Sequence, residues 1–97
     1  MPCCYIIYSS SIDSFYIGVT HGSMNQRLQS HNRGKYSKSF TAKAKDWEVF
    51  LTLAGDDYAH AIRMERKIKG MKSRKYLINL KKYNELRNKV ILETRSN

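Results

Sequence analysis

Two short runs of aromatic and β-branched residues near the N-terminus constrain the fold more than any other feature of the chain. They occupy residues 3–8 and 15–19, and the stretch between them, 9–14, is polar and rich in serine. This pattern predicts a β-hairpin with a longer connection. The chain is therefore expected to begin with two antiparallel strands.

The rest of the chain predicts one more strand and several helices. Ser23 is a suitable N-cap with Gln26 at the third helical position, and Asp56 or Asp57 can cap a second helix. The expected elements are a helix over 24–30, a loop over 31–46, a strand over 47–53, and helices over 58–71, from 73 onward and over 84–93. This order predicts an α/β fold of the α+β type, in which helices flank a small three-stranded antiparallel sheet.

Length and charge narrow the class of protein. The chain has 97 residues, which suits a single domain spanning 1–97. Its 18 Lys and Arg against 8 Asp and Glu give a net charge of +10. Such an excess favours a polyanionic partner, because each cation placed on a phosphate releases a condensed counterion. The favoured explanation of this charge is a nucleic-acid partner. Two weaker explanations are a basic protein that charge repulsion keeps soluble and a protein that binds a membrane surface.

The only two cysteines, Cys3 and Cys4, are adjacent. Adjacent cysteines cannot staple a fold, and no second Cys or His cluster has zinc-binding spacing, so neither a disulfide framework nor a zinc finger is expected. The N-terminus lacks a signal-peptide pattern, and no apolar run approaches the length of a membrane span. We expect a cytoplasmic protein with no membrane partner.

Strand alternation gives the hairpin two distinct faces. If Tyr8 pairs with Phe15, then Tyr5 lies opposite Gly18. One face collects residues suited to a core, namely Cys4, Ile6, Tyr8, Phe15, Ile17 and Val19. The other face holds Tyr5, Ile7, Tyr16 and Gly18. Gly18 leaves this second patch open to something that approaches the phenols closely, although a helix could also cover the patch.

Glu65 is an unexpected acid within a basic segment. It shares a helical stripe with Tyr58, Ala61 and Ile68, which is the side of that helix expected to pack inward. A carboxylate placed there needs a partner, because burying it unpaired costs several kcal/mol. Two partners remain open: an arginine in a salt bridge, or Mg²⁺, which keeps water ligands and takes phosphate oxygens.

Arg27 and His31 are four residues apart at the end of the first expected helix and so lie side by side. An arginine fork can hold a phosphate, and an imidazole can donate to a phosphate oxygen or a leaving group. The alternative is an exposed arginine and a histidine favoured by the helix dipole.

Together these residues resemble the GIY-YIG endonuclease family, in its small single-domain branch found mostly in bacteria. The resemblance rests on Tyr5, on the intact Tyr16-Ile17-Gly18, on Arg27 and His31 in RLQSH, and on Glu65. It continues through the His-Asn, Phe-Thr and Trp pattern of HNRGKYSKSFTAKAKDWEV and through MERKIKGMKSRKYL. In place of the family's Gly-Ile-Tyr motif the chain has Cys3-Cys4-Tyr5, which keeps only the tyrosine. Many relatives carry a late asparagine near the metal, and neither Asn79 nor Asn84 aligns well enough to take that role.

The resemblance implies an endonuclease that hydrolyses phosphodiester bonds in DNA with one Mg²⁺ or Mn²⁺ and no small-molecule cofactor. It implies that Tyr5 helps to activate the attacking water, that Tyr16 and Arg27 hold the scissile phosphate, and that His31 assists. Glu65 would be the only protein carboxylate on the metal. A non-catalytic nucleic-acid-binding module and a basic structural protein of a ribonucleoprotein are the alternatives.

Basic residues outside these motifs are expected to track the DNA backbone. Those expected to do so are Arg33, Lys35, Lys38, Lys43, Arg66, Lys69, Lys72, Arg74 and Lys75.

Overall fold

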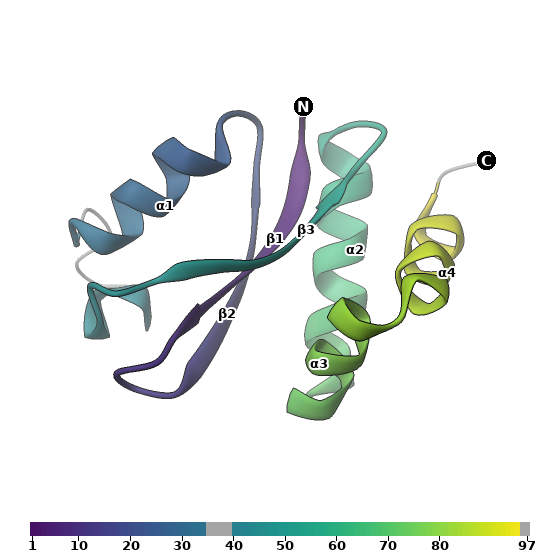
Figure 1. Cartoon of the computed structure of the whole chain (residues 1–97). Coiled ribbons are helices and arrows are strands. Elements are labelled where there is room, and N and C mark those ends of the chain that lie inside the picture. The colour runs from purple at the N-terminus through teal and green to yellow at the C-terminus, as the bar shows by residue number, and fades with distance from the viewer. Residues whose placement is uncertain (35–39, 96–97) are drawn as a thin grey trace.

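A computed structural model describes residues 1–34 and 40–95 of the chain. Three strands, β1 (Cys3–Ser9), β2 (Ser14–Thr20) and β3 (Glu48–Ala54), form one antiparallel sheet in the order β2-β1-β3. β1 is therefore the central strand and β2 lies at an edge (Figure 1). The predicted fold class, a small three-stranded antiparallel sheet with flanking helices, is confirmed.

The hairpin has the predicted register, with Tyr8 opposite Phe15 and Tyr5 opposite Gly18. Each strand extends into the predicted connection, because Ser9 and Ser14 also pair. Serines of the hairpin connection bind Asp46, which precedes β3: the Ser11 N–H donates to this carboxylate over 2.9 Å. These hydrogen bonds, the one from Ser9 above all, lower the pKa of Asp46 to about 2.

Two helices start at predicted caps, with Asp57 rather than Asp56 capping the second, and Ser73 caps the third although only a helix start was predicted there. The side chains of Ser23, Asp57 and Ser73 accept the N–H of the third residue that follows each of them. The helices are α1 (Met24–Asn32), α2 (Tyr58–Met71), α3 (Arg74–Lys82) and α4 (Asn84–Thr94), with a 3-10 helix, η1 (Phe40–Lys43), between α1 and β3. The predicted loop over 31–46 is wrong at two places, because α1 continues two residues further and η1 lies within it.

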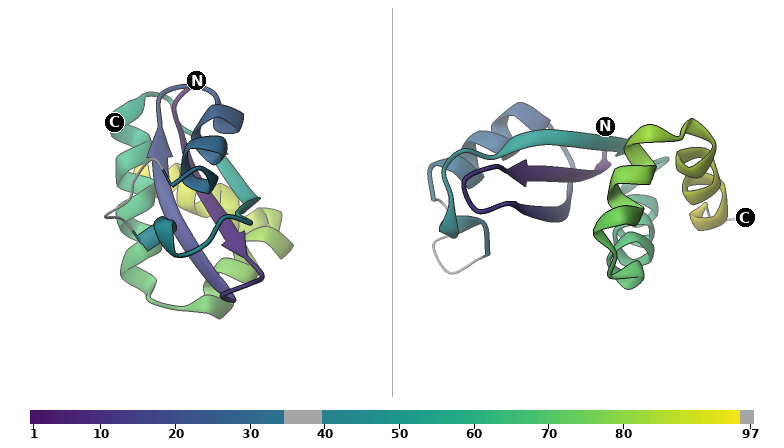
Figure 2. Two further views of the ribbon diagram at one scale, coloured as in Figure 1. Left: turned by 90° about the vertical axis from the view of Figure 1, so that its left-hand side faces the viewer. Right: turned by 60° about the horizontal axis from the view of Figure 1, so that its bottom comes forward.

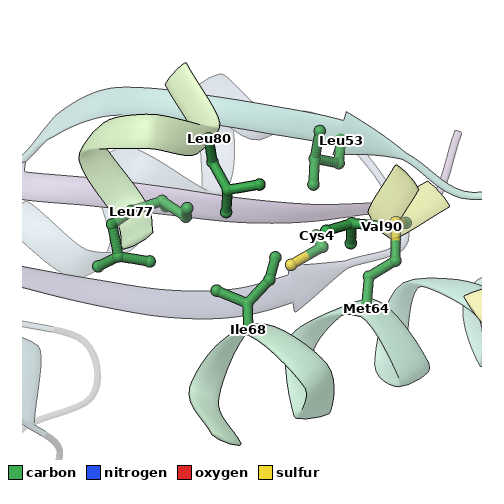
Figure 3. Close-up of a cluster of buried hydrophobic side chains, with 8 residues drawn as sticks. Cys4, Leu53, Met64, Ile68, Leu77, Leu80 and Val90 are labelled. Carbon is green, nitrogen blue, oxygen red and sulfur yellow. The ribbon is translucent and has the colours of Figure 1, made fainter. Parts of the chain in front are cut away.

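Helices cover both faces of the sheet. α1 and η1 lie on one side, and α2, α3 and α4 lie on the other (Figures 1 and 2). On the α2 side, Cys4 and Leu53 of the sheet pack against Met64, Ile68 and Leu80, as Figure 3 shows. On the α1 side, a second buried cluster holds Tyr5, Ile7, Ala44 and Trp47.

The prediction of an open second hairpin face is therefore wrong. Tyr5 has 0% of its surface exposed, because α1 and the segment around η1 cover it. Tyr8, predicted to lie in the core, is only half-buried, and its hydroxyl donates to Asp13 in the turn. Alternation assigns the face of each side chain, but the position of the helices decides how deeply that side chain is buried.

α4 is attached to α2 through buried Val90 in the apolar core and through polar contacts. Buried His60 accepts the Asp56 N–H at Nδ1, so its Nε2 carries the proton that faces the Ile91 carbonyl oxygen at 3.0 Å. Arg63 Nε donates to the Thr94 carbonyl over 2.6 Å. Among the described residues, no helix combines the length and the apolar composition of a membrane span.

Candidate active site

Tyr5, Arg27 and His31 meet on the face of the sheet that α1 covers. The Tyr5 hydroxyl and His31 Nε2 share a hydrogen bond of 2.8 Å, and Arg27 Nε donates to the same hydroxyl over 3.2 Å. The other imidazole nitrogen, Nδ1, shares a hydrogen bond of 2.7 Å with the hydroxyl of Thr41. Three of the predicted catalytic residues thus belong to one hydrogen-bonded chain that joins β1, α1 and η1.

His31 is buried, and its imidazole is neutral near pH 7. Desolvation, followed by the charge of Arg27, lowers the pKa of His31 from 6.5 to about 4. A neutral imidazole has one N–H and one unprotonated nitrogen. In the tautomer protonated at Nδ1, the Tyr5 oxygen accepts a hydrogen bond from Arg27 and donates one to Nε2. The Nδ1–H group then faces the Thr41 hydroxyl. In that arrangement neutral His31 accepts a hydrogen bond from the phenol and orients it.

Gly18 makes room for the Tyr5 ring itself. A Cβ built at Gly18 would lie 2.5 Å from the Tyr5 hydroxyl oxygen and 3.1 Å from Cε2 of Tyr16. Because Tyr5 and Gly18 are cross-strand partners, the phenol lies over the backbone of its own neighbour. The sequence predicted that some group approaches Gly18 closely, and that group is the Tyr5 side chain.

Tyr16 joins the same cluster from β2. Its ring centroid lies 5.3 Å from that of His31 and 6.4 Å from that of Tyr5. Unlike Tyr5, it is half-buried. Tyr16 and Arg27, which is also half-buried, therefore form the accessible part of the cluster.

Glu65 lies on α2 and so on the other side of the sheet. Its side chain is 19% exposed, and Oε2 is 3.2 Å from the ammonium of Lys69. The salt bridge expected from the sequence is thus present, but its partner is a lysine one turn away rather than an arginine. On this side, burial and then the Glu65 charge raise the pKa of the Cys4 thiol to about 12.

A metal at Glu65 would have at most two protein ligands of the usual kinds in the described part of the chain. Among residues 1–34 and 40–95, no three His, Cys, Asp or Glu side chains converge on a common point. A single carboxylate suits Mg²⁺, which retains waters and binds substrate phosphate oxygens. The part-exposed Glu65 carboxylate fits such an ion once Lys69 moves aside.

A groove of about 600 Å³ lies at the end of β2, beside Arg27. Arg27 and Arg33 line it on the α1 side, and Tyr58 lines it at the start of α2. Tyr58 and Glu65 are seven residues apart on α2, which places them on the same helix face about 10 Å apart. The groove thus reaches the first turn of α2, about two turns from Glu65, which does not line it.

A second groove, of about 280 Å³, lies at the other end of β2. Its lining includes Lys69, Lys72 and Arg74, three of the residues expected to bind DNA. Arg74 also has an intramolecular role, because its Nη2 donates to Asp13 Oδ1 over 2.6 Å. The two grooves place basic side chains at both ends of the same edge strand.

Of the other expected DNA contacts, only Arg33 lines one of these two grooves among the described residues. Arg33, Arg66 and Lys75 are exposed, and the ammonium of Lys43 lies 4.8 Å from the centre of the Phe40 ring. Lys35 and Lys38 lie outside the described residues.

Thr41, Asn32 and Trp47 support the site, although no role was predicted for them. Asn32 Oδ1 accepts the Trp47 N–H over 2.7 Å, and its amide donates to the Trp47 carbonyl over 3.0 Å. Trp47 Nε1 in turn donates to the Thr41 carbonyl over 2.9 Å. The His-Asn, Phe-Thr and Trp pattern contained all three residues, but their contacts require the segment 40–47 to fold back on α1.

The late asparagines lie on the α2 side of the sheet. Asn84 Oδ1 accepts from Arg87 over 3.3 Å at the start of α4, and the Asn79 carbonyl accepts the Tyr83 N–H over 2.8 Å at the end of α3. The first contact lies within α4, and the second closes the C-terminal end of α3.

In a comparison with protein families, the model of the GIY-YIG catalytic domain matches residues 1–84. The match includes the whole sheet, α1, α2 and α3, whereas α4 follows it. Comparison with curated proteins and with solved structures gave no significant match.

Proposed function

Since this chain belongs to the GIY-YIG family, whose domain is a nuclease domain, we propose that it is a metal-dependent endonuclease that hydrolyses phosphodiester bonds in DNA. The observation that carries the proposal is the hydrogen-bonded chain of Arg27, Tyr5, His31 and Thr41. A phenol is a plausible base only where a cation stabilises its anion and a neighbour orients its hydroxyl by a hydrogen bond. Arg27 and neutral His31 provide both.

Each residue then has a task that follows from its position. Arg27 lines the groove and contacts Tyr5, so it would bind the phosphate and hold it next to Tyr5, the general base. Tyr16, on the accessible side of the cluster, holds the scissile phosphate with it. Glu65 would hold the divalent ion, which would stabilise charge on the phosphate and the leaving oxygen.

The test is cleavage of a supercoiled plasmid in Mg²⁺ or Mn²⁺ by the parent protein and by two matched variants. Glu65→Gln keeps the side-chain size and removes the charge that pairs with Lys69. Glu93→Gln is the control, because Glu93 pairs with Lys67 at a similar distance of 3.1 Å. We expect Glu65→Gln to bind DNA in the absence of metal but not to cut it, and Glu93→Gln to cut normally. Equal cleavage by both variants would refute the assignment of Glu65.

A second candidate is a nucleic-acid-binding module without cleavage. The burial of Tyr5 and the Glu65–Lys69 pair favour it, since a base must meet water and a metal must displace the ammonium. Both candidates require affinity that falls linearly with salt on a log-log plot. Plasmid cleavage by the parent protein separates them, and a flat salt plot would exclude both.

A further inference from the structure

The groove beside Arg27 contains an aromatic pair that no step of phosphodiester hydrolysis uses. The rings of His21 and Tyr58 stack with centroids 3.7 Å apart and an interplanar angle of 8°. His21 follows β2 and Tyr58 begins α2, and both segments lie at the end of the sheet that carries the N-terminus (Figures 1 and 2). The two rings therefore form one flat block that joins separate elements of the fold.

Both rings line the groove, and they differ in exposure. Tyr58 is half-buried, whereas His21 is exposed. A stacked pair covers one face of each ring, so the outer face of His21 is the surface that the block offers to solvent. A flat, exposed aromatic face is the kind of surface on which a nucleobase stacks.

The remaining lining suits the rest of a nucleotide. Arg27 and Arg33 contribute positive charge, Gln26 and Gln29 contribute amide groups, and the described lining contains no carboxylate. Gln26, Ser30 and Arg33 recur at helical spacing along one side of α1, so polar and cationic groups follow the length of the groove. A groove with cations along one wall and an aromatic face at one end fits a short piece of single strand.

We propose that this groove binds an unpaired nucleotide next to the scissile phosphate, with its base stacked on the outer face of His21 and with Tyr58 supporting that ring from behind. The substrate class would then be DNA with a flap or a splayed junction, because the bases of an intact duplex have their faces covered by neighbours. This inference rests on the proposed function for the position of the scissile phosphate at Arg27. It adds a structural preference for DNA that the hydrolysis itself does not require.

The experiment measures binding by fluorescence anisotropy in EDTA, where no cleavage occurs. The probes are a duplex with a single-stranded flap, the same duplex with abasic sites in the flap, and the fully paired duplex. The parent protein should bind the flap roughly 5- to 150-fold more tightly than the abasic flap, which is the effect of one base–aromatic stack. His21→Ala and Tyr58→Leu should abolish this difference, whereas Tyr58→Phe should keep it.

Tyr83→Leu is the matched control, because Tyr83 is an exposed tyrosine at the junction of α3 and α4. It should keep the preference for the flap. If Tyr58→Leu fails to fold, His21→Ala, which alters an exposed ring, provides the same test. Equal binding of the flap and the abasic flap by the parent protein would overturn the proposal, and so would an unchanged preference in a folded His21→Ala. Plasmid cleavage and the salt dependence of duplex binding do not require a preference for the flap. A failure of this proposal can therefore be told apart from a failure of the nuclease function.

Discussion

The two faces of the sheet are both buried, but different forces bury them. On the α2 side, Cys4, Ile6, Met64 and Leu80 pack as an apolar core, in which each contact is weak and non-directional. On the α1 side, the cluster around Tyr5 contains polar groups that each need a defined partner. Among the described residues, every buried side-chain nitrogen or oxygen has one.

This difference indicates how each face should respond to mutation. A methyl group lost from the apolar core costs stability and leaves chemistry elsewhere intact. A hydroxyl lost from the α1 face leaves its former partner buried and unpaired, and it alters the reactivity of the group beside it. We therefore expect stability and activity to separate on the α2 side and to change together on the α1 side.

The largest expected effect is that of Tyr5→Phe on cleavage. Without the phenol, the rate should fall by about 100- to 10,000-fold, which is the contribution typical of a general base. The fold should also lose about 1–3 kcal/mol, because His31 Nε2 loses its partner in a buried site. Single-turnover cleavage and denaturant unfolding measure the two quantities. Tyr8→Phe, whose hydroxyl contacts exposed Asp13, should cut normally; cleavage by Tyr5→Phe at the parent rate would show that the α1 face is only packing.

Leu80→Ala tests the apolar face. Leu80 has 0% of its surface exposed, so the substitution should destabilise the fold by about 2–5 kcal/mol through lost burial and a residual cavity. Cleavage per folded molecule should not change, because Leu80 packs on the opposite side of the sheet from Tyr5. Leu92→Ala is the control, since Leu92 is 63% exposed and should cost less than about 0.5 kcal/mol. A loss of specific activity in Leu80→Ala would contradict the separation of the two faces.

Gly18→Ala probes the close approach of Tyr5. The added methyl group would overlap the Tyr5 hydroxyl, so we expect a loss of about 1–3 kcal/mol from overpacking together with reduced cleavage. Gly70→Ala is the matched control, because its Cβ meets nothing within 4 Å and it lies in α2. It should gain up to about 1 kcal/mol from helix propensity. Thermal melts of the two variants should move in opposite directions, and a stabilised Gly18→Ala would mean that Tyr5 lies elsewhere.

The smallest expected effect is a shift in the titration of His31. NMR of the imidazole should give a pKa of about 4 in the parent protein. Arg27→Gln should raise this pKa, because the arginine charge is the second cause of the depression after burial.

The same titration has a consequence for stability. The folded pKa of His31 is depressed, so the unfolded chain binds this proton first, and stability should decline as pH falls from about 6.5 toward about 4. Unfolding measured across this range should show a smaller decline in His31→Gln. An imidazole that titrates at its usual value would mean that His31 is not buried.

Local chemistry was sufficient to predict much of this protein from its sequence. The hairpin register follows from side-chain alternation, so the pairing of Tyr5 with Gly18 required no knowledge of the rest of the fold. The cap at Ser23 and the choice between Asp56 and Asp57 could be predicted, because an N-cap acts on a donor only three residues away. Helical spacing likewise placed Arg27 beside His31.

Only the tertiary structure decided the contacts between segments that are far apart in the chain. Tyr5 is buried because the segment around Trp47 folds back over it, and His31 meets Thr41 for the same reason. His21 stacks on Tyr58 across 37 positions of sequence. Periodicity reports which face of its own element a side chain occupies, whereas burial, partners and pKa depend on what lies opposite. That is set by how the helices pack on the sheet, and no local pattern encodes it.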